Sequence, residues 1–590
     1  MPFVSVVPAI RTPFGVDVFD YRVTEGSKLV PGDLVRVPFR RRILPALVVA
    51  CAAESPYADR AVSITGDPIL RLGGSVVPLL ASTAKRSFSS QPTVFTSWIR
   101  HVPVRTILAH ERPLSSNASL RQQKTIYTAA RIPSVIEQAK LATGRVLILT
   151  PWQHRADLVA KHLGSAVLHA DLADGAAWKA CASFIGNTTS TLVTTRIGAW
   201  LSCIADTVII DEPENDDHKQ DELSPRIDAR WLVDEAARIR TDLSVIKIGT
   251  TPMLSSWVDR RDPGSLSSAS WRIVRDDNKI EIPTLNVELT TEQWQRGSRS
   301  PIAGLSSAAV EQLEVALEEN KLVVIVHPVH GDRSRIHCRD CRWTMMCPNC
   351  GFQLTAEMTN ARCHRCGQTS NLLNECPSCG GADLSAARVG KDRVALQIQQ
   401  AYGDRVRVAD LPEWHRLSLS KGALVIVSDI SLIGGYVEDI RRRERFVIAW
   451  RRIAAAVAQA EGKLYALGPE TALADARSFL EAGGVASTWD AEWKEREAFQ
   501  YPPTHPRIKL IVDGGLEEGA TAVDVATKVL PPDWTVEGPY LVAYRSKTRK
   551  SRTILHLLPP KGSNLDQEFS LLEPLAKAGI IDLDPIAFFS

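Results

Sequence analysis

Residues 207–212 read Thr-Val-Ile-Ile-Asp-Glu, an unbroken run of β-branched residues that ends in two carboxylates. Such a run is typical of a strand buried on both faces, because a half-exposed strand alternates apolar with polar residues. Similar runs, separated from it by helical stretches, lie at residues 146–150, 191–194 and 244–248. Strands that alternate with helices in this way predict an α/β domain whose parallel sheet is covered on both faces.

The rest of the chain divides into regions of different character. A second set of apolar runs, at residues 322–326, 423–427, 446–449 and 464–467, predicts a second parallel sheet. The first 105 residues or so carry β-branched runs at 3–7, 33–38 and 43–49 and predict a small β-rich domain. Residues 82–119 are rich in Ser, Thr and Pro and read as a connector. After residue 490, strands at 507–512 and 553–558 around a helix predict an α+β domain.

Cysteine spacing is the most specific chemical signal in the chain. Eight of the eleven cysteines form four Cys-x-x-Cys pairs, namely Cys338/Cys341, Cys347/Cys350, Cys363/Cys366 and Cys376/Cys379. Two such pairs supply the four thiolates that Zn²⁺ prefers, so eight ligands predict two zinc ions. A disulfide framework is the alternative, but the start of the chain lacks the pattern of a secretory signal. Spacing alone leaves open whether the pairs combine sequentially or in a nested order.

Bulk composition places few limits on function. The chain has 590 residues, of which 44% are hydrophobic and 23% charged, and a formal net charge of +3. This charge is too small to identify a partner, so any nucleic-acid surface must be local. The longest apolar stretches are far shorter than the roughly 20 residues that span a bilayer. We therefore expect a soluble cytoplasmic protein that has no membrane partner.

The acidic pair Asp211 and Glu212 has the form of the strand end that holds Mg²⁺ and polarises water in motor ATPases. The phosphate-binding loop that should accompany it, Gly-x-x-x-x-Gly-Lys-Ser/Thr, is absent from the sequence. Its expected place, residues 125–136, contains neither glycine nor lysine and includes Pro133, which has no amide to donate. Residues 451–462 also lack the pattern that usually supplies an arginine finger. The sequence therefore predicts no catalytic or cofactor-binding residue, and binding of ATP and Mg²⁺ is not expected.

Several segments together resemble one family, the primosomal replication-restart protein PriA, a superfamily-two DNA helicase. The resemblance rests on residues 19–23 (Phe-Asp-Tyr-Arg-Val), 31–39 (Pro-Gly-Asp-Leu-Val-Arg-Val-Pro-Phe), 208–214, 248–252 (Ile-Gly-Thr-Thr-Pro), the cysteine region up to Leu384, and 495–503 (Glu-Arg-Glu-Ala-Phe-Gln-Tyr-Pro-Pro). It implies an α/β protein with two tandem RecA-like lobes. The implied domains are a β-rich 3′-DNA-end-binding domain (1–105), a degenerate first lobe (106–270), a second lobe (271–335 and 385–490) with a two-zinc insertion (336–384), and a C-terminal α+β domain (491–590).

The same resemblance implies particular ligands. Zinc pairing would be nested, with Cys338, Cys341, Cys376 and Cys379 on one ion and Cys347, Cys350, Cys363 and Cys366 on the other. The last base of a DNA 3′ end would bind near Phe19 and Asp20, although Asp20 also fits a β-turn aspartate that is satisfied by its own turn. The family has glycine where this chain has Arg40. The basic runs Arg40-Arg41-Arg42 and 544–552 are the expected phosphate contacts.

The chain also departs from the family in three parts of the motor. Besides the missing loop, Glu214 replaces a histidine, and residues 427–434 replace a Gly-Thr-Gln-Met segment. The leading prediction is a replication-restart protein that binds branched DNA at abandoned forks and promotes primosome assembly without helicase activity. Its expected partners are primosome proteins, the replicative helicase or its loader, and single-stranded DNA-binding protein. The alternatives are an active 3′ to 5′ helicase with a non-standard nucleotide site, and a zinc-dependent scaffold that does not bind DNA.

Overall fold

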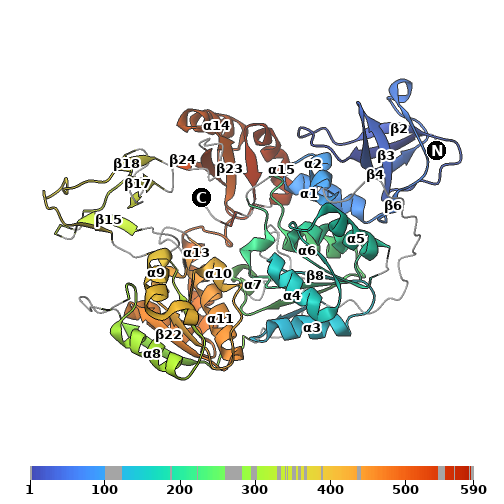
Figure 1. Cartoon of the computed structure of the whole chain (residues 1–590). Helices are drawn as coiled ribbons and strands as arrows, with labels where there is room; N and C mark the ends of the chain where they lie inside the picture. Colours follow the sequence, from blue (N-terminus) through green and yellow to red (C-terminus); the bar gives the residue numbers. More distant parts are fainter. Residues whose placement is uncertain are drawn as a thin grey trace.

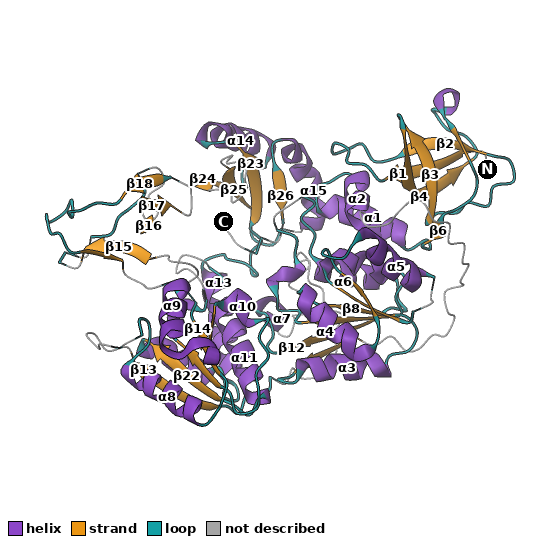
Figure 2. Cartoon of the chain, viewed as in Figure 1, coloured by secondary structure: helices purple, strands orange, loops and turns teal. Residues whose placement is uncertain are grey.

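The structure is a computed structural model, and most of the chain is described in it. The described residues are 3–99, 123–186, 189–221, 224–258, 282–293, 300, 302–328, 334–338, 340–341, 343–348, 354–356, 360–363, 368–386, 390–434, 440–542, 552–563, 565–583 and 585–586. Within these residues the strands form five sheets (Figures 1 and 2). Among the helices described, none is both long enough and apolar enough to cross a membrane.

The N-terminal sheet is largely antiparallel and has the strand order β5-β2-β1-β4-β3-β6. Its strands are β1 (Phe3–Pro8), β2 (Phe19–Val23), β3 (Asp33–Phe39), β4 (Arg42–Ala52), β5 (Ser63–Ile64) and β6 (Leu70–Arg71). Alternating residues of β1 and β3, such as Val4, Val6, Val35 and Val37, share one buried core. The β-rich N-terminal region predicted from the sequence is therefore confirmed.

The reading of residues 82–119 as a connector is wrong for the part that the structure describes. Helices α1 (Val76–Arg86) and α2 (Gln91–Ile99) pack on residues 196–203, where Trp98 stacks on Trp200 with ring centroids 6.1 Å apart. The polar residues that suggested a connector bond the helix backbone instead, since Thr83 Oγ1 donates to the Leu79 carbonyl. Residues 100–122 lie outside the described residues.

The first α/β unit contains a six-stranded parallel sheet of order β7-β12-β11-β8-β10-β9. Its strands are β7 (Gln123–Tyr127), β8 (Val146–Leu149), β9 (Ala166–Leu168), β10 (Thr191–Thr194), β11 (Thr207–Asp211) and β12 (Ser244–Gly249), and its longer helices are α3 (Arg131–Leu141), α4 (Gln153–Leu163), α5 (Asp174–Ile185) and α6 (Ala229–Ile239). In β11, Val208 and Ile210 face one core while Ile209 faces another. Burial on both faces explains the unbroken apolar runs, and all four predicted strands are confirmed.

The second α/β unit contains a five-stranded parallel sheet of order β13-β22-β21-β14-β20. Its strands are β13 (Glu288–Gln293), β14 (Val323–Val326), β20 (Val406–Ala409), β21 (Leu424–Val427) and β22 (Lys463–Gly468), and its helices are α8 (Ser307–Glu318), α9 (Lys391–Tyr402), α10 (Leu411–Trp414), α11 (Arg442–Gln459), α12 (Glu470–Ser478) and α13 (Gly484–Ala498). The strand predicted at 446–449 is wrong, because these residues lie inside α11. Its buried residues Val447, Trp450, Ala454 and Val457 recur with helical spacing.

The cysteine-rich segment follows β14 and leads into α9, so it is inserted in the second unit. Its strands β15 (Ser334–Cys338), β16 (Leu354–Ala356), β17 (Asn360–Cys363), β18 (Thr369–Asn371) and β19 (Leu384–Ala386) form a separate antiparallel sheet. Figure 1 shows this segment, the cysteine-rich arm, extending away from the two parallel sheets. Its exposed apolar side chains include Met346, Leu372 and Leu373.

The C-terminal domain is α+β, as predicted. Its antiparallel sheet has the order β24-β25-β23-β26, formed by β23 (Ile508–Asp513), β24 (Thr535–Val542), β25 (Arg552–Leu558) and β26 (Ile580–Asp582), with helices α14 (Leu516–Val529) and α15 (Leu565–Leu572). Asp582 joins this domain to the first α/β unit. Its Oδ1 lies 2.5 Å from Lys219 Nζ, and its Oδ2 lies 3.2 Å from Arg226 Nη1.

Candidate functional site

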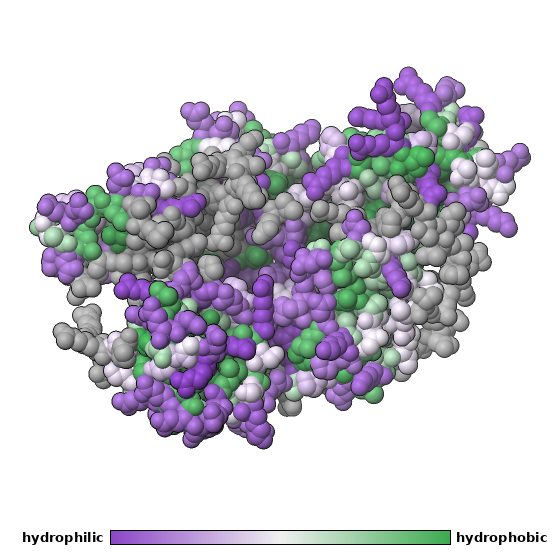
Figure 3. Space-filling view, in the orientation of Figure 1, coloured by the Kyte–Doolittle hydropathy of each residue, from purple (hydrophilic) through white to green (hydrophobic). Residues whose placement is uncertain are grey.

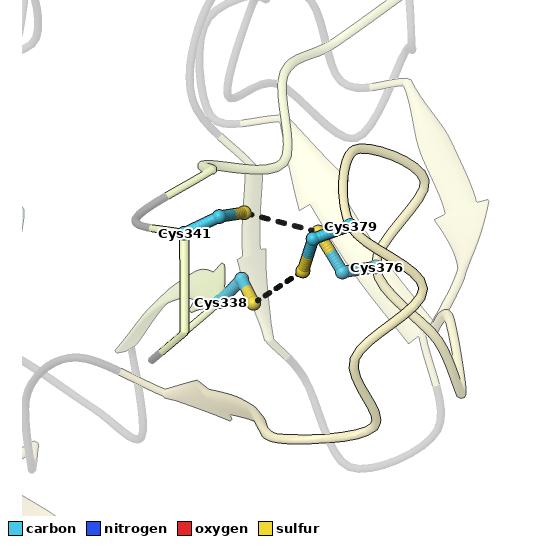
Figure 4. Close-up of side chains that lie close together, drawn as sticks. All are labelled: Cys338, Cys341, Cys376 and Cys379. Carbon is cyan, nitrogen blue, oxygen red and sulfur yellow. Dashed lines mark hydrogen bonds between the residues drawn. The ribbon is translucent and has the colours of Figure 1, made fainter.

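Four cysteines of the arm form a compact sulfur cluster (Figure 4). Cys338 Sγ lies 3.6 Å from Cys379 Sγ, and Cys341 Sγ lies 3.6 Å from Cys376 Sγ. All four sulfur atoms are within 4.8 Å of one another. A tetrahedral zinc ion with Zn–S bonds of about 2.3 Å requires sulfur atoms about 3.8 Å apart. The cluster could therefore hold one metal ion.

Two tight turns bring these cysteines together. On one side the Cys338 amide donates to the Trp343 carbonyl over 2.7 Å. On the other side the Gly380 amide donates to the Cys376 carbonyl, and Gly380 has φ of +72°, a conformation that favours glycine. The first and last pairs along the chain thus share one cluster. The spacing of the pairs could not have shown this.

The remaining pairs are described only in part. Cys347 and Cys363 are both buried and belong to one small apolar cluster with Ile336, Met345 and Leu354. Their partners Cys350 and Cys366 lie outside the described residues.

The acidic pair at the end of β11 lies in a buried ionic cluster. Glu212 forms ion pairs with Arg131 of α3, with Arg155 of α4 at 3.5 Å and with Arg452 of α11 at 3.2 Å. Asp211 lies 3.9 Å from Arg155. None of these five side chains is more than 12% exposed. Arg452 belongs to the second α/β unit and the other four residues to the first, so the ionic cluster joins the two units.

Burial and charge act differently on the two carboxyl groups. Burial raises the pKa of Asp211 to about 6, against the opposing effect of Arg155. At Glu212 burial acts in the same direction, but the guanidinium groups of Arg131, Arg452 and Arg155 outweigh it and hold the pKa well below its usual range. Glu212 is therefore an ionised carboxylate whose charge is compensated by arginines.

The turn before α3 provides little for a phosphate group. The Thr128 amide donates to the Gly249 carbonyl, and the Ala130 amide donates to the Thr128 hydroxyl. Arg131, the first residue of α3, reaches Glu212. Two amides of the turn thus donate to groups inside the protein.

Sequence reasoning missed the three arginines of the ionic cluster. The only signal for one of them was the doublet Arg451-Arg452 in an otherwise apolar helix. Arg451 is fully buried and donates to the carbonyls of Pro283 and Phe479, while its neighbour Arg452 reaches Glu212. The region in which no arginine finger was found therefore does place one arginine at the boundary between the units.

Glu214 and His218, which follow Glu212 in the chain, are also buried and hydrogen-bonded. Glu214 accepts hydrogen bonds from the amide and the hydroxyl of Thr250. The segment 248–252 is thereby tied to the acidic segment. His218 is buried and donates through Nε2 to the Asp211 carbonyl, and burial lowers the pKa of its imidazole to about 4.

The predicted 3′-end site lies on the N-terminal sheet. Phe19 and Asp20 are part of β2, and the rings of Phe19 and Phe39 meet edge to face at 5.2 Å. Asp20 is not a turn residue: Ser5 and Ser55 each donate a hydroxyl to one of its carboxylate oxygens over 2.6 Å.

Of the two basic runs, residues 40–42 are fully described in the structure and residues 544–552 only in part. Arg40, with φ of +54°, turns the chain between β3 and β4, and Arg40, Arg41 and Arg42 are exposed there. Of the run at 544–552, only Arg552 is among the described residues, and it pairs with Asp513 at 2.7 Å.

Parts of the chain are similar to known proteins. Residues 9–89 match the family described as the 3′DNA-binding domain (3′BD) of PriA. The replication restart protein PriA of Thermotoga maritima is 23% identical over 248 residues, which cover 42% of this chain and 30% of that protein. PriA of Bacillus subtilis is 28% identical over 195 residues, which cover 32% of this chain and 23% of that protein.

The aligned part of the chain spans less than a third of either relative. Among solved structures, the DEAH/RHA helicase HrpB of Escherichia coli superposes with a TM-score of 0.31 at 12% identity, over 61% of this chain and 42% of that one. The N-terminal domain match and the PriA relatives show that parts of this chain are similar to PriA proteins.

Proposed function

We propose that this protein binds branched DNA with a free 3′ end at stalled or abandoned replication forks and promotes primosome assembly there. The observation that carries the proposal is the match of residues 9–89 to a 3′-DNA-binding domain. These residues include strands β2 to β4, with Phe19 and Asp20 on β2 and three exposed arginines at the adjoining turn. Aromatic and carboxylate groups suit a terminal base, and arginines suit its phosphates.

We also propose that this protein does not use ATP to unwind DNA. A motor needs its strand-end glutamate free to act on water beside a bound nucleotide. Here Glu212 is neutralised by Arg131, Arg155 and Arg452, and the turn before α3 has no glycine. These features support a protein that has the fold of a motor ATPase but does not hydrolyse ATP.

We also propose two zinc ions in the cysteine-rich arm, in a nested arrangement. The sulfur geometry of Cys338, Cys341, Cys376 and Cys379 supports the first site. The second would use Cys347, Cys350, Cys363 and Cys366, and the packing of Cys347 and Cys363 in one cluster supports it. Zinc would fix the shape of an arm that otherwise has only a small core.

We also propose that both α/β units are RecA-like lobes. The proposed domains are residues 1–105, 106–270, 271–335 with 385–490, 336–384 and 491–590. Primosome proteins, a replicative helicase or its loader, and single-stranded DNA-binding protein are the proposed partners. Figure 3 shows hydrophobic side chains on the surface of the arm, and Met346, Leu372 and Leu373 are exposed there. Exposed apolar groups on a projecting arm support a contact with another protein.

The test is binding to two forks that differ only at the 3′ end, one with a free hydroxyl and one with a blocking phosphate. We expect tighter binding to the free end and a steep loss of affinity with salt, because arginine contacts to phosphates release counterions. Asp20→Asn should reduce the preference for the free end, whereas Asp59→Asn, an exposed change in the same domain, should not. Equal affinity of the unaltered protein for both forks would contradict the proposal that it recognises the 3′ end.

Phosphate release from ATP, measured with and without fork DNA, tests the second part of the proposal. We expect the background rate in both cases. Fork-stimulated release that disappears in Asp211→Asn would show an active motor and overturn this part.

A further inference from the structure

We propose that buried ion pairs hold the two α/β units of this protein in a single closed arrangement that needs no nucleotide. This inference concerns the body of the protein and does not depend on DNA binding. In nucleotide-driven proteins, closure of two domains is usually produced by a ligand bound between them. Here the closing contacts are side chains of the chain itself, so they are always present.

The first contact is the pair of Arg452 in α11 with Glu212 at the end of β11. Their nitrogen and oxygen atoms are 3.2 Å apart, and both side chains are buried. Close by, the ring of Trp152 stacks on His415 of the second unit with centroids 4.0 Å apart. His154 donates through Nε2 to the His415 carbonyl over 2.8 Å. This side of the boundary therefore combines charge pairing, stacking and a hydrogen bond.

A second set of contacts lies at the start of α11. Arg441 Nη1 lies 3.0 Å from Asp216 of the first unit, and Arg445 Nε lies 3.7 Å from the same carboxylate. Glu444 accepts a hydrogen bond over 3.2 Å from the amide of Leu254, which follows β12 of the first unit and packs its side chain in the core of the second. Charges of both signs on this helix thus meet partners on the opposite unit.

A third set of contacts involves α13. Trp489 donates its indole N–H to the Pro252 carbonyl over 3.1 Å, and the indole of Trp257 donates to Asp490 over 2.8 Å. Trp489 is fully buried, so the apolar packing of α13 adds to its hydrogen bond. Three separate regions of the second unit are therefore fixed to the first.

Each contact across the boundary adds to the free-energy cost of opening it, although Glu212 would keep Arg131 and Arg155 of the first unit. Opening the boundary would separate Arg452 from Glu212 and Arg441 from Asp216 together. The closed arrangement is therefore expected to be the only one that is populated. The two units would act as one rigid platform between the N-terminal domain and the cysteine-rich arm.

Distances between the two units test this inference. Dyes can be attached through noncanonical amino acids at Glu137 in α3 and Glu318 in α8, which are exposed and lie on different units. For the full-length protein we expect one narrow distance distribution that Mg²⁺-ATP does not change. Arg452→Met should add a second population at longer distance. Arg238→Met, which removes an exposed arginine paired within α6, should leave the distribution narrow.

Asp216→Asn provides an independent variant if Arg452→Met does not fold, because it removes a different contact across the same boundary. A broad distribution in the unaltered protein would overturn the inference. Distributions that stay narrow in both variants would also overturn it. If the unaltered protein shows a narrow distance distribution but does not bind forks, only the proposed function is contradicted.

Discussion

The guanidinium of Arg452 lies 3.2 Å from the carboxylate of Glu212, across the boundary between two α/β units. Glu212 occupies the strand end at which a motor ATPase would polarise water, whereas Arg452 lies in a helix that lacks an arginine-finger pattern. The two side chains neutralise each other in a buried setting. Residues that would meet a nucleotide in a motor thus make a structural contact in this protein.

Glu212→Gln should destabilise the protein rather than change a catalytic rate. The amide cannot compensate Arg131, Arg155 and Arg452, and breaking a buried pair costs about 3–5 kcal/mol. The urea midpoint of the α/β units is the measurement. Glu470→Gln, a matched change in an exposed pair with Arg477, should cost less than about 1 kcal/mol. Equal midpoints for the two variants would contradict a stabilising role for Glu212.

The contribution of His218 to stability should fall as the pH is lowered from about 6.5 toward 4. The folded pKa of this imidazole is about 4, below its ordinary value of 6.5, so the unfolded chain binds a proton in this window and the folded protein does not. The loss reaches about 3 kcal/mol for a shift of this size. Asp211, with its pKa raised to about 6, acts in the opposite direction because its folded form takes up a proton over nearly the same window.

His218→Gln isolates the contribution of the histidine. Urea unfolding at pH 6.5 and at pH 4 should show a smaller difference for this variant than for the unaltered protein. An identical pH dependence in the two proteins would mean that His218 titrates normally.

The strands could be predicted from the sequence where burial on both faces left an unbroken apolar run, as in β8, β10, β11 and β12. The same rule failed at 446–449, because α11 is buried almost all round and its apolar run looks like that of a strand. The connector prediction for residues 82–119 failed for another reason, because hydroxyl groups at the end of α1 bond helix carbonyls although their composition is typical of a loop.

The candidate site was predictable to different degrees. Cysteine spacing is local, so the ligand type followed directly, whereas the grouping of Cys338 with Cys376 depends on two distant turns. Arg131, Arg155 and Arg452 come from three helices that are far apart in the chain, and no local pattern marks them. Only folding brings them to one carboxylate.

Metal content is expected to be close to two zinc ions per chain in reduced, folded protein. Cys376→Ser should lower it by one equivalent, because it removes a ligand of the sulfur cluster that includes Cys338. Cys51→Ser should leave it unchanged, since Cys51 lies in the N-terminal sheet. Elemental analysis of both variants is the measurement. A metal content well below two equivalents in the unaltered protein would contradict the nested arrangement.

Lys219→Met should loosen the C-terminal domain from the first α/β unit. The side chains of Lys219 and Asp582 are each 2% exposed and lie 2.5 Å apart, so the variant removes one of the cations that act on the Asp582 carboxylate, while Arg226 and Lys509 stay. Burial without full compensation is unfavourable, and the domain can hydrate Asp582 only by moving away. Hydrogen exchange of β26 and β23 should therefore become faster. Lys463→Met, which breaks an exposed pair with Glu288, is the control and should leave exchange in these strands unchanged. Unchanged exchange in Lys219→Met as well would show that apolar packing alone holds the domain.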